Sequence, residues 1–381
     1  MPPASTLYHR KDKESDKKPK NNYRLVTGMK LNNNLSKGCQ LCQKGKWLCI
    51  FLTYRCNAGC HFCPAPFNDD RVYSDFGSKK EDILAYLTGN DFRGISFSGG
   101  DPFLVFDRLM DWLRYFKNRL PEYYYWVYTS GLPADKLKIR ELAEAGMDEI
   151  RFNIAASGYI SDTVWESIAE ARKFFRYVSV EIPSIRKDFR LLKTALEKLE
   201  KSRVDYLNLH DYILTERDSL HNRDHLSKFV LNRITVLNYA DSSVKNTEDI
   251  LRIASEKGYH FHINHCSMEK KEIQMTRRRI MMAKVFNDPE YDMFLNDGTI
   301  LNFHLIPDYI KTGNLQEMLP DPQFAKLLRS TLIKLRELNK PFNPGYKIIK
   351  ASYIPQMNIY QEKILLKAEF MSLEPGSKEI I

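Results

Sequence analysis

The stretch that decides the fold reads WLCIFLTYRCNAGCHFC and runs from Trp47 to Cys63. Its first part, Trp47 to Tyr54, is a continuous apolar run, which is typical of a buried strand in a parallel sheet. Its last part holds Cys56, Cys60 and Cys63 in the spacing C-x-x-x-C-x-x-C. A buried strand therefore leads directly into a loop with three cysteines.

This cysteine loop predicts an iron–sulfur site. Three thiolates on one short loop can each ligate one iron of a 4Fe–4S cube and leave the fourth iron without a protein ligand. An open metal position can chelate a small molecule. The alternative is a zinc loop, but structural zinc sites usually combine two C-x-x-C units, so the pattern favours the cluster.

Strand and helix patterns then alternate along roughly the next 160 residues. The predicted strands are Trp47–Tyr54, Gly94–Ser98, Tyr123–Thr129, Glu149–Ile154, Tyr177–Pro183 and Tyr206–His210. The predicted helices are Lys79–Leu87, Leu104–Phe116, Ala134–Ala145, Val164–Phe174 and Arg190–Lys201. Helical crossovers between successive strands require a parallel sheet, and crossovers of one hand curl it toward a barrel.

Polar residues follow these strands where each strand ends, which is where curled parallel sheets carry their functional groups. Ser98-Gly99-Gly100-Asp101-Pro102 follows the second strand. Its glycines let the backbone approach a ligand closely, and Asp101 can accept a hydrogen bond from an ammonium group. Taken alone, the same residues also fit an ordinary turn.

The later strand ends offer further candidates for contacts with substrate or cofactor. Arg151 and Asn153 are two residues apart and so share one face of the fourth strand. The others are Thr129-Ser130-Gly131 after the third strand, Glu181 on the fifth strand, and His210-Asp211 after the sixth.

The cysteine loop with Phe62, followed one strand later by Gly-Gly-Asp-Pro, resembles the radical S-adenosylmethionine (SAM) superfamily. The resemblance implies a partial (βα)6 barrel, a 4Fe–4S cluster on Cys56, Cys60 and Cys63, and reductive cleavage of SAM to a 5′-deoxyadenosyl radical. It also implies residues that bind SAM: Phe62 against the adenine; Ser98, Gly99, Gly100 and Asp101 at the amine; Thr129 and Ser130 at the ribose; and Asn153. The common motif has glutamate where this chain has Asp101.

A narrower resemblance is to a mostly archaeal family related to the pyruvate formate-lyase activating enzymes. It rests on a Cys-x-x-Cys before the first strand, on the strand-end segments Tyr128–Gly131, Asp148–Phe152 and Val180–Pro183, and on His265-Cys266-Ser267 before a basic helix. It spans about Gly38 to Phe286.

Four cysteines lie outside the loop. Cys39 and Cys42 have the spacing of metal ligands, and Cys266 follows His265 directly. Together, Cys39, Cys42, Cys266 and His265 predict a second site, for zinc or for an auxiliary iron–sulfur cluster. The alternative is a reduced thiol pair in a surface loop. Cys49 lies in the middle of a strand, and we expect it in the core.

Composition limits the class of protein. The chain has 381 residues and a net charge of +10, and six of its seven cysteines cluster between Cys39 and Cys63, which favours metal over disulfides. No apolar stretch reaches the roughly 18 residues of a membrane span, and the polar N-terminus lacks a signal-peptide core, so we expect a cytoplasmic protein without a membrane segment.

The expected organisation has five parts. They are a disordered basic tail (1–24), the Cys-x-x-Cys segment (25–46), the partial barrel (47–212), an extension with His-Cys-Ser and a basic helix (213–286), and a mixed α+β C-terminal extension (287–381). The basic helix, near Glu269–Phe286, contains Arg277-Arg278-Arg279, which we expect to be a solvated face. An alternative is that it docks an acidic redox protein or a phosphate-bearing substrate.

The sequence therefore predicts an enzyme, an oxidoreductase or an activase, acting on an unidentified substrate held above the barrel. Its candidate catalytic residues are Arg151, Glu181, His210 and His262. The implied electron donor is a flavodoxin or a ferredoxin. The competing prediction is an iron–sulfur or zinc module whose basic face binds nucleic acid, which leaves Ser98 to Asp101 unexplained.

Overall fold

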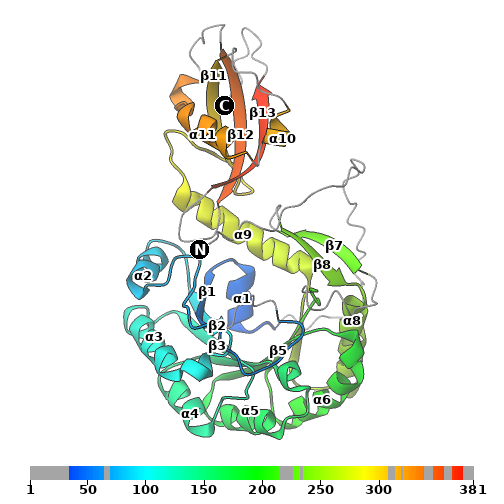
Figure 1. Ribbon diagram of the computed structural model, residues 1–381. Coiled ribbons are helices and arrows are strands. Elements are labelled where there is room, and N and C mark those ends of the chain that lie inside the picture. The colour runs from blue at the N-terminus through cyan, green and yellow to red at the C-terminus, as the bar shows by residue number, and fades with distance from the viewer. Residues whose placement is uncertain are drawn as a thin grey trace. The chain divides into compact units, whose positions relative to one another are not determined.

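The barrel sheet is parallel and has seven strands, not the six expected. The computed structural model describes residues 34–63, 69–214, 226–231, 235–307, 314–318, 321–338, 346–355 and 363–371. The strand order is β1-β2-β3-β4-β5-β6-β9 (Figure 1). Their bounds are β1 Trp47–Thr53, β2 Gly94–Gly99, β3 Tyr124–Thr129, β4 Glu149–Phe152, β5 Tyr177–Pro183, β6 Tyr206–His210 and β9 His262–Cys266. The predicted partial α/β barrel is confirmed; the expected tail, residues 1–24, lies outside the described residues.

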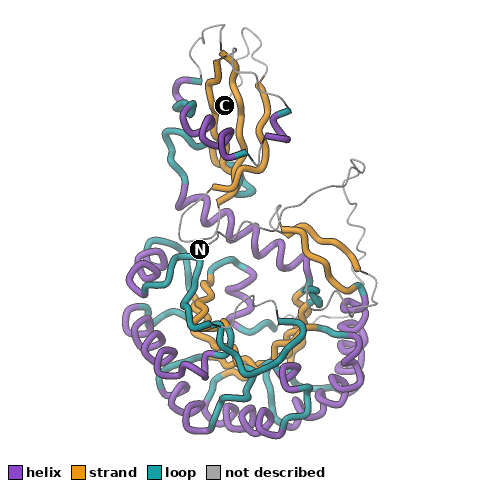
Figure 2. The backbone as a smooth tube through the Cα atoms, in the orientation of Figure 1, coloured by secondary structure: helices purple, strands orange, loops and turns teal. Residues whose placement is uncertain are grey.

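Helices cover the outside of this sheet, as Figure 2 shows. They are α2 Lys80–Thr88, α3 Phe106–Arg119, α4 Lys136–Glu144, α5 Asp162–Phe174, α6 Phe189–Lys201 and α8 Ser242–Lys257. Each places an apolar stripe on the sheet; in α3, Leu109, Leu113 and Phe116 recur at helical spacing and are fully buried. Among the helices of the described residues, none combines the length and hydropathy that a bilayer crossing requires.

The seventh strand changes the expected organisation. β9 pairs in parallel with β6, with Tyr206 opposite His262 and His210 opposite Cys266. The α8 helix makes the crossover that brings it there, so the expected extension (213–286) contributes a strand to the barrel sheet. The same region also holds the antiparallel hairpin of β7 Leu226–Leu231 and β8 Thr235–Ala240.

The Cys-x-x-Cys segment forms a short helix, α1 Lys37–Gln43, inside the ring of strands (Figure 1). Leu41 packs there against Tyr124 and Trp126 of β3. Gly38 lets α1 approach the barrel interior closely, because a Cβ atom at this position would lie 2.4 Å from a guanidinium nitrogen of Arg151 and would force it to move. One end of the barrel interior is thus filled by α1.

We expected the basic helix, α9 Met268–Phe286, to be a solvated face, but most of it is not. Arg278 and Arg279 are only 3% exposed. Arg278 forms an ion pair with Asp75 and donates to the carbonyl of Trp47 at 3.0 Å. The central arginines therefore attach α9 to its neighbours, because burial of a guanidinium requires such partners.

The C-terminal extension is mixed α+β, as predicted. Its antiparallel sheet follows the order β10-β11-β12-β13. The elements are β10 Met293–Phe294, β11 Ile300–Pro307, α10 Leu315–Met318, α11 Pro322–Ser330, β12 Tyr346–Pro355 and β13 Lys363–Met371. A small core that includes Ile306, Phe324 and Ile349 holds helix and sheet together.

Because His304 is buried on β11, we expect the stability of this part of the chain to be sensitive to acid. Its Nδ1 atom lies 2.6 Å from the carbonyl of Leu328, its Nε2 atom has no hydrogen-bond partner in the described structure, and burial lowers its pKa to about 4. The unfolded chain binds this proton near pH 6.5, so stability falls as pH drops from 6.5 toward 4, by up to about 3 kcal/mol. In urea unfolding at pH 7.0 and 4.5, His304→Gln should lose less stability between the two pH values than the wild type. An equal loss would contradict the prediction.

Candidate active site

A cavity of about 690 Å³ lies at the C-terminal ends of the barrel strands. Most of the residues that the sequence singled out line this cavity. From that set its walls contain Cys56, Cys60, Cys63, Phe62, Ser98, Gly99, Gly100, Thr129, Ser130, Arg151, Asn153, Glu181 and His210. Cavities of this size hold cofactors and small substrates.

All three cysteines of the cysteine loop line this cavity. The amide of Ala58 donates to Sγ of Cys56 at 3.4 Å, and the amide of Cys63 donates to the carbonyl of Cys60 at 3.3 Å. Burial and the neighbouring thiols raise the pKa of Cys60 to about 11. Three cysteines on one loop that lines a cavity suit a 4Fe–4S cube, in which each thiolate binds a different iron.

The glycine loop lies directly against the cysteine loop. The amide of Gly100 donates to the carbonyl of Thr53 at 2.7 Å, and that of Asp101 donates to the carbonyl of Arg55 at 2.8 Å. A Cβ atom on Gly100 would lie 1.9 Å from that Arg55 oxygen, so only glycine allows this approach. The two segments therefore form one wall beside the cysteines, with room for SAM against the backbone.

Asp101 does not reach the cavity, contrary to the expected contact with the SAM ammonium. Its side chain is fully buried and accepts hydrogen bonds from the amide and hydroxyl of Ser130 at 2.8 and 2.6 Å. It also accepts from the Thr129 hydroxyl at 3.0 Å and the Phe103 amide at 3.2 Å. Burial raises the pKa of Asp101, although these hydrogen bonds oppose the shift. The carboxylate thus joins the ends of β2 and β3.

This arrangement predicts that Asp101→Ala destabilises the protein even without SAM. The substitution leaves buried amides without an acceptor, so we expect a loss of about 2–3 kcal/mol in the free energy of unfolding. Asp107→Ala, an exposed change on α3, serves as the control and should cost less than about 0.5 kcal/mol. Unchanged stability of the Asp101 variant, with weaker SAM binding, would instead favour direct contact with SAM.

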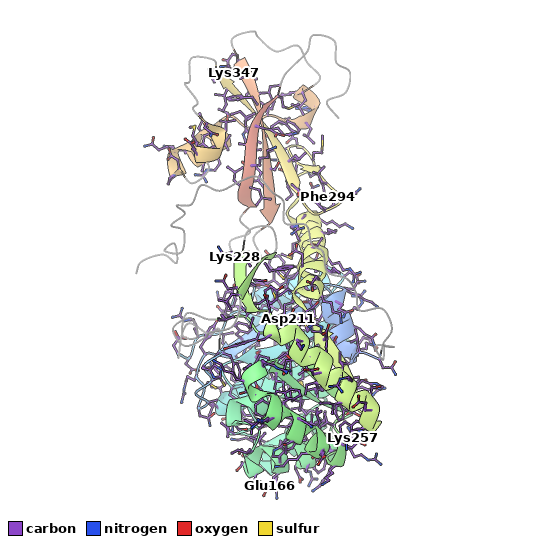
Figure 3. All side chains as sticks on the ribbon, turned by 90° about the vertical axis from the view of Figure 1, so that its right-hand side faces the viewer. Glu166, Asp211, Lys228, Lys257, Phe294 and Lys347 are labelled. Atoms are coloured by element: carbon purple, nitrogen blue, oxygen red, sulfur yellow. The ribbon has the colours of Figure 1, made fainter. Side chains whose placement is uncertain are left out.

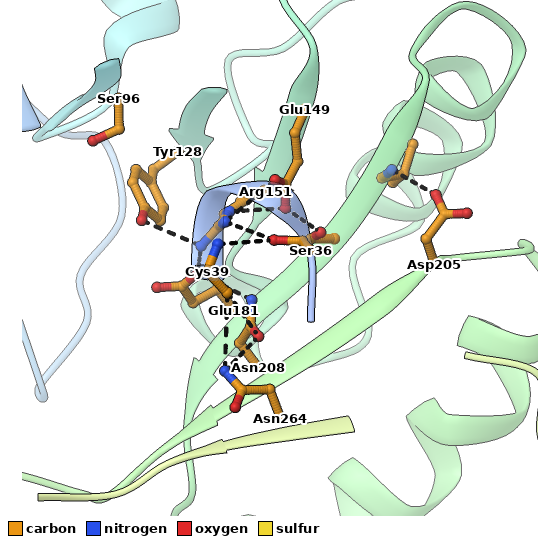
Figure 4. Close-up of polar contacts among 12 residues, drawn as sticks. Ser36, Cys39, Ser96, Tyr128, Glu149, Arg151, Glu181, Asp205, Asn208 and Asn264 are labelled. Atoms are coloured by element: carbon orange, nitrogen blue, oxygen red, sulfur yellow. Dashed lines mark hydrogen bonds and ion pairs between the residues drawn. The ribbon is translucent and has the colours of Figure 1, made fainter. Parts of the chain in front are cut away.

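Three charged side chains form the floor of the cavity. Nη1 of Arg151 lies 2.6 Å from Oε2 of Glu181 (Figure 4). Nε2 of His210 lies 2.8 Å from Oε1 of the same carboxylate. Burial alone would raise the pKa of Glu181, but the charges of Arg151 and His210 lower it to about 2. Burial lowers the pKa of His210, but Cys266 and Glu181 raise it to about 9. His210 is therefore a proton-bearing donor at neutral pH.

Glu149 lies on the other side of Arg151, deeper in the barrel. It is fully buried and lies 2.9 Å from Nε of Arg151. It also accepts from the hydroxyls of Tyr124 at 3.1 Å and Ser179 at 2.5 Å. The guanidinium donates to Ser36 as well, at 3.0 Å, which ties α1 to the barrel interior (Figure 4).

Two histidines do not lie where the sequence suggested. His262 begins β9, so the roughly 3.3 Å rise per strand residue places it about 13 Å from Cys266 and away from the cavity. His265 does not face the thiols, because alternation along β9 turns it away from Cys266. Its Nε2 atom lies instead 2.7 Å from Oδ1 of Asp211, which follows β6 (Figure 3).

Sequence reasoning did not single out several cavity residues as site candidates, among them Tyr128, Lys271 and Cys49. Alternation could have found two of them. Cys49 shares the inner face of β1 with Phe51 and lines the cavity, while Leu48 and Ile50 face outward and are fully buried. The expectation that Cys49 lies in the core is therefore wrong. Tyr128 is opposite Arg151 in the β3–β4 register. For Lys271, on α9, the sequence holds no signal.

Comparison with known proteins identifies the domain. Residues 50–159 match the model of the radical SAM superfamily, and they contain the cysteine loop and the glycine loop. The chain contains a radical SAM domain. It is also 26% identical, over 81% of both chains, to a Methanocaldococcus jannaschii protein named provisionally as a glycyl-radical enzyme activating enzyme. This agrees with the expected likeness to an archaeal family related to activating enzymes.

Two solved structures share less sequence identity with this chain. SuiB of Streptococcus suis bound to S-adenosylmethionine is 13% identical, with a TM-score of 0.45, over 58% of this chain and 50% of that chain. The radical S-adenosylmethionine methyltransferase TsrM of Kitasatospora setae is 11% identical, with a TM-score of 0.41, over 58% of this chain and 54% of that chain. The chain thus spans about half the length of these two structures.

Proposed function

We propose that this radical SAM enzyme is an activating enzyme that removes a hydrogen atom from a glycine residue of a partner protein. The observation that carries the proposal is the M. jannaschii relative, which matches 81% of both chains and is named for such an activity. A cavity that joins the cysteine loop to the glycine loop supports it. The expected cytoplasmic location fits this function.

Different residues in the walls of the cavity have different roles in the proposed reaction. Cys56, Cys60 and Cys63 hold the cluster, and the backbone of Gly99 and Gly100 binds the SAM amine. When bound, the cluster and SAM supply the radical that takes the substrate hydrogen and becomes 5′-deoxyadenosine. Further wall residues that bind SAM are Phe62, Thr129, Ser130 and Asn153.

At the floor of the cavity, three charged side chains orient the substrate or SAM: Arg151, Glu181 and His210. Their mutual ion pairs fix the His210 ring, whose Nε2 atom lies 2.8 Å from Glu181. One electron per cleavage has to come from outside, and a flavodoxin or ferredoxin is the donor class we expect.

The first test is anaerobic turnover. The reconstituted chain with SAM and dithionite should release 5′-deoxyadenosine, measured by mass spectrometry. Absence of that product, together with salt-sensitive RNA binding, would support the competing nucleic-acid module.

The second test identifies the hydrogen source. Source cells are grown on glycine deuterated at the α-carbon, and their extract is desalted before it is added to the enzyme. The proposal predicts 5′-deoxyadenosine one mass unit heavier, with deuterium transfer that survives nuclease treatment and is lost after protease treatment. Product without deuterium would contradict the glycine assignment and leave the first test unaffected.

A further inference from the structure

The barrel interior contains a second group of thiols that the radical SAM chemistry does not use. Cys39, Cys42 and Cys266 line a smaller cavity of about 40 Å³ beside the floor of the first. His210 lines both cavities. Of the chain's seven cysteines, only Cys49 lies outside both this group and the cysteine loop.

Secondary structure explains why residues more than 200 positions apart meet there. Cys39 and Cys42 are three residues apart on α1 and so lie on one side of the helix. Alternation along β9 points Cys266 into the barrel, and the β6–β9 register places it opposite His210. His210 and Cys266 both line the small cavity.

We propose that this small cavity binds one thiophilic divalent ion, Zn²⁺, through Cys39, Cys42, Cys266 and His210. Three thiolates and one imidazole are a common ligand set for structural zinc. His210 replaces His265, which we expected in this role from the sequence and which bonds Asp211 instead.

The surroundings of the four side chains resemble the outer shell of a metal site. A histidine that ligates a metal usually directs its other ring nitrogen to a carboxylate, and Nε2 of His210 lies 2.8 Å from Glu181. Side-chain amide nitrogens donate to two of the thiols: Nδ2 of Asn264 to Sγ of Cys39 at 3.9 Å, and Nε2 of Gln274 to Sγ of Cys42. The Arg151 guanidinium, which also lines the cavity, offsets thiolate charge.

The cavity size decides between the two kinds of metal that the sequence left open. One water needs about 10–15 Å³, so 40 Å³ holds an ion but not a 4Fe–4S cube. Among the described residues, no three His, Cys, Asp or Glu side chains yet surround one ion position. Binding would therefore draw the thiols together and fasten α1 to β9, the last strand of the open sheet.

The experiment uses Co²⁺ as a spectroscopic substitute for Zn²⁺. The full chain with Cys56, Cys60 and Cys63 changed to serine removes the cluster loop, and we expect it to bind one Co²⁺ per chain with thiolate charge-transfer absorption. Adding Cys266→Ser or Cys42→Ser should weaken binding at least tenfold. Adding Cys49→Ser, a thiol of the same barrel interior, should leave it unchanged.

Two results would overturn the proposal. One is a triple-serine chain, folded by circular dichroism, that binds no Co²⁺. The other is a triple-serine chain that retains several irons with acid-labile sulfide, which would mean an auxiliary cluster. Because Cys42→Ser and Cys266→Ser change different elements, misfolding of one variant leaves the other as the test. A failed radical SAM assay does not affect either outcome.

Discussion

Replacing Cys60 with alanine should abolish 5′-deoxyadenosine formation from SAM, with a loss beyond about 10³-fold, which corresponds to roughly 4 kcal/mol in the barrier. Cys60 lies between Cys56 and Cys63 on the loop, and all three thiols line the large cavity. Without one ligand the cube cannot be held at three corners, so no iron is presented to SAM. The measurement is product release under dithionite, with iron and sulfide content determined on the same samples.

Cys49→Ala is the matched control for that experiment. Cys49 lines the same cavity, but it comes from β1 and not from the loop. Its substitution should leave iron content and SAM cleavage close to wild type. Full turnover by the Cys60 variant would end the assignment of the loop as the cluster site, and loss of iron in the Cys49 variant would show that the loop alone does not define it.

The sequence predicted the barrel well because its signals are local. Trp47 to Tyr54 is apolar throughout, each strand is followed by a helical pattern, and a cysteine spacing is visible without any structure. Gly99 and Gly100 were also found, because close backbone approach leaves few alternatives to glycine. These features need no knowledge of which residues meet across the fold.

What the sequence could not predict depends on distant partners. The role of Asp101 is set by Ser130 and Thr129, one strand away, and no local pattern tells a carboxylate that binds a ligand from one that joins two loops. His265 has a plausible position beside Cys266, but only the β9 register shows that it faces Asp211. The burial of Arg278 likewise depends on Asp75.

Arg151→Met should destabilise the protein strongly, by about 3–5 kcal/mol, because removing one partner of a buried ion pair leaves charge without compensation. The guanidinium is 3% exposed and lies between Glu149, which is fully buried, and Glu181. His210 still pairs with Glu181 in the variant, so the carboxylate left without a cation is Glu149. The measurement is the free energy of unfolding in urea.

Arg172→Met provides the comparison, since it makes the same chemical change in an ion pair with Asp205 whose side chains are 34% and 27% exposed. Such a pair contributes about 0–1 kcal/mol. Adding Glu149→Gln to Arg151→Met should restore part of the lost stability, because a neutral amide no longer needs a buried cation. If Arg151→Met and Arg172→Met lose equal stability, the interior pairs contribute no more than surface ones. If the glutamine restores nothing, the loss comes from the packing of Arg151 against α1 and Trp126, not from its charge.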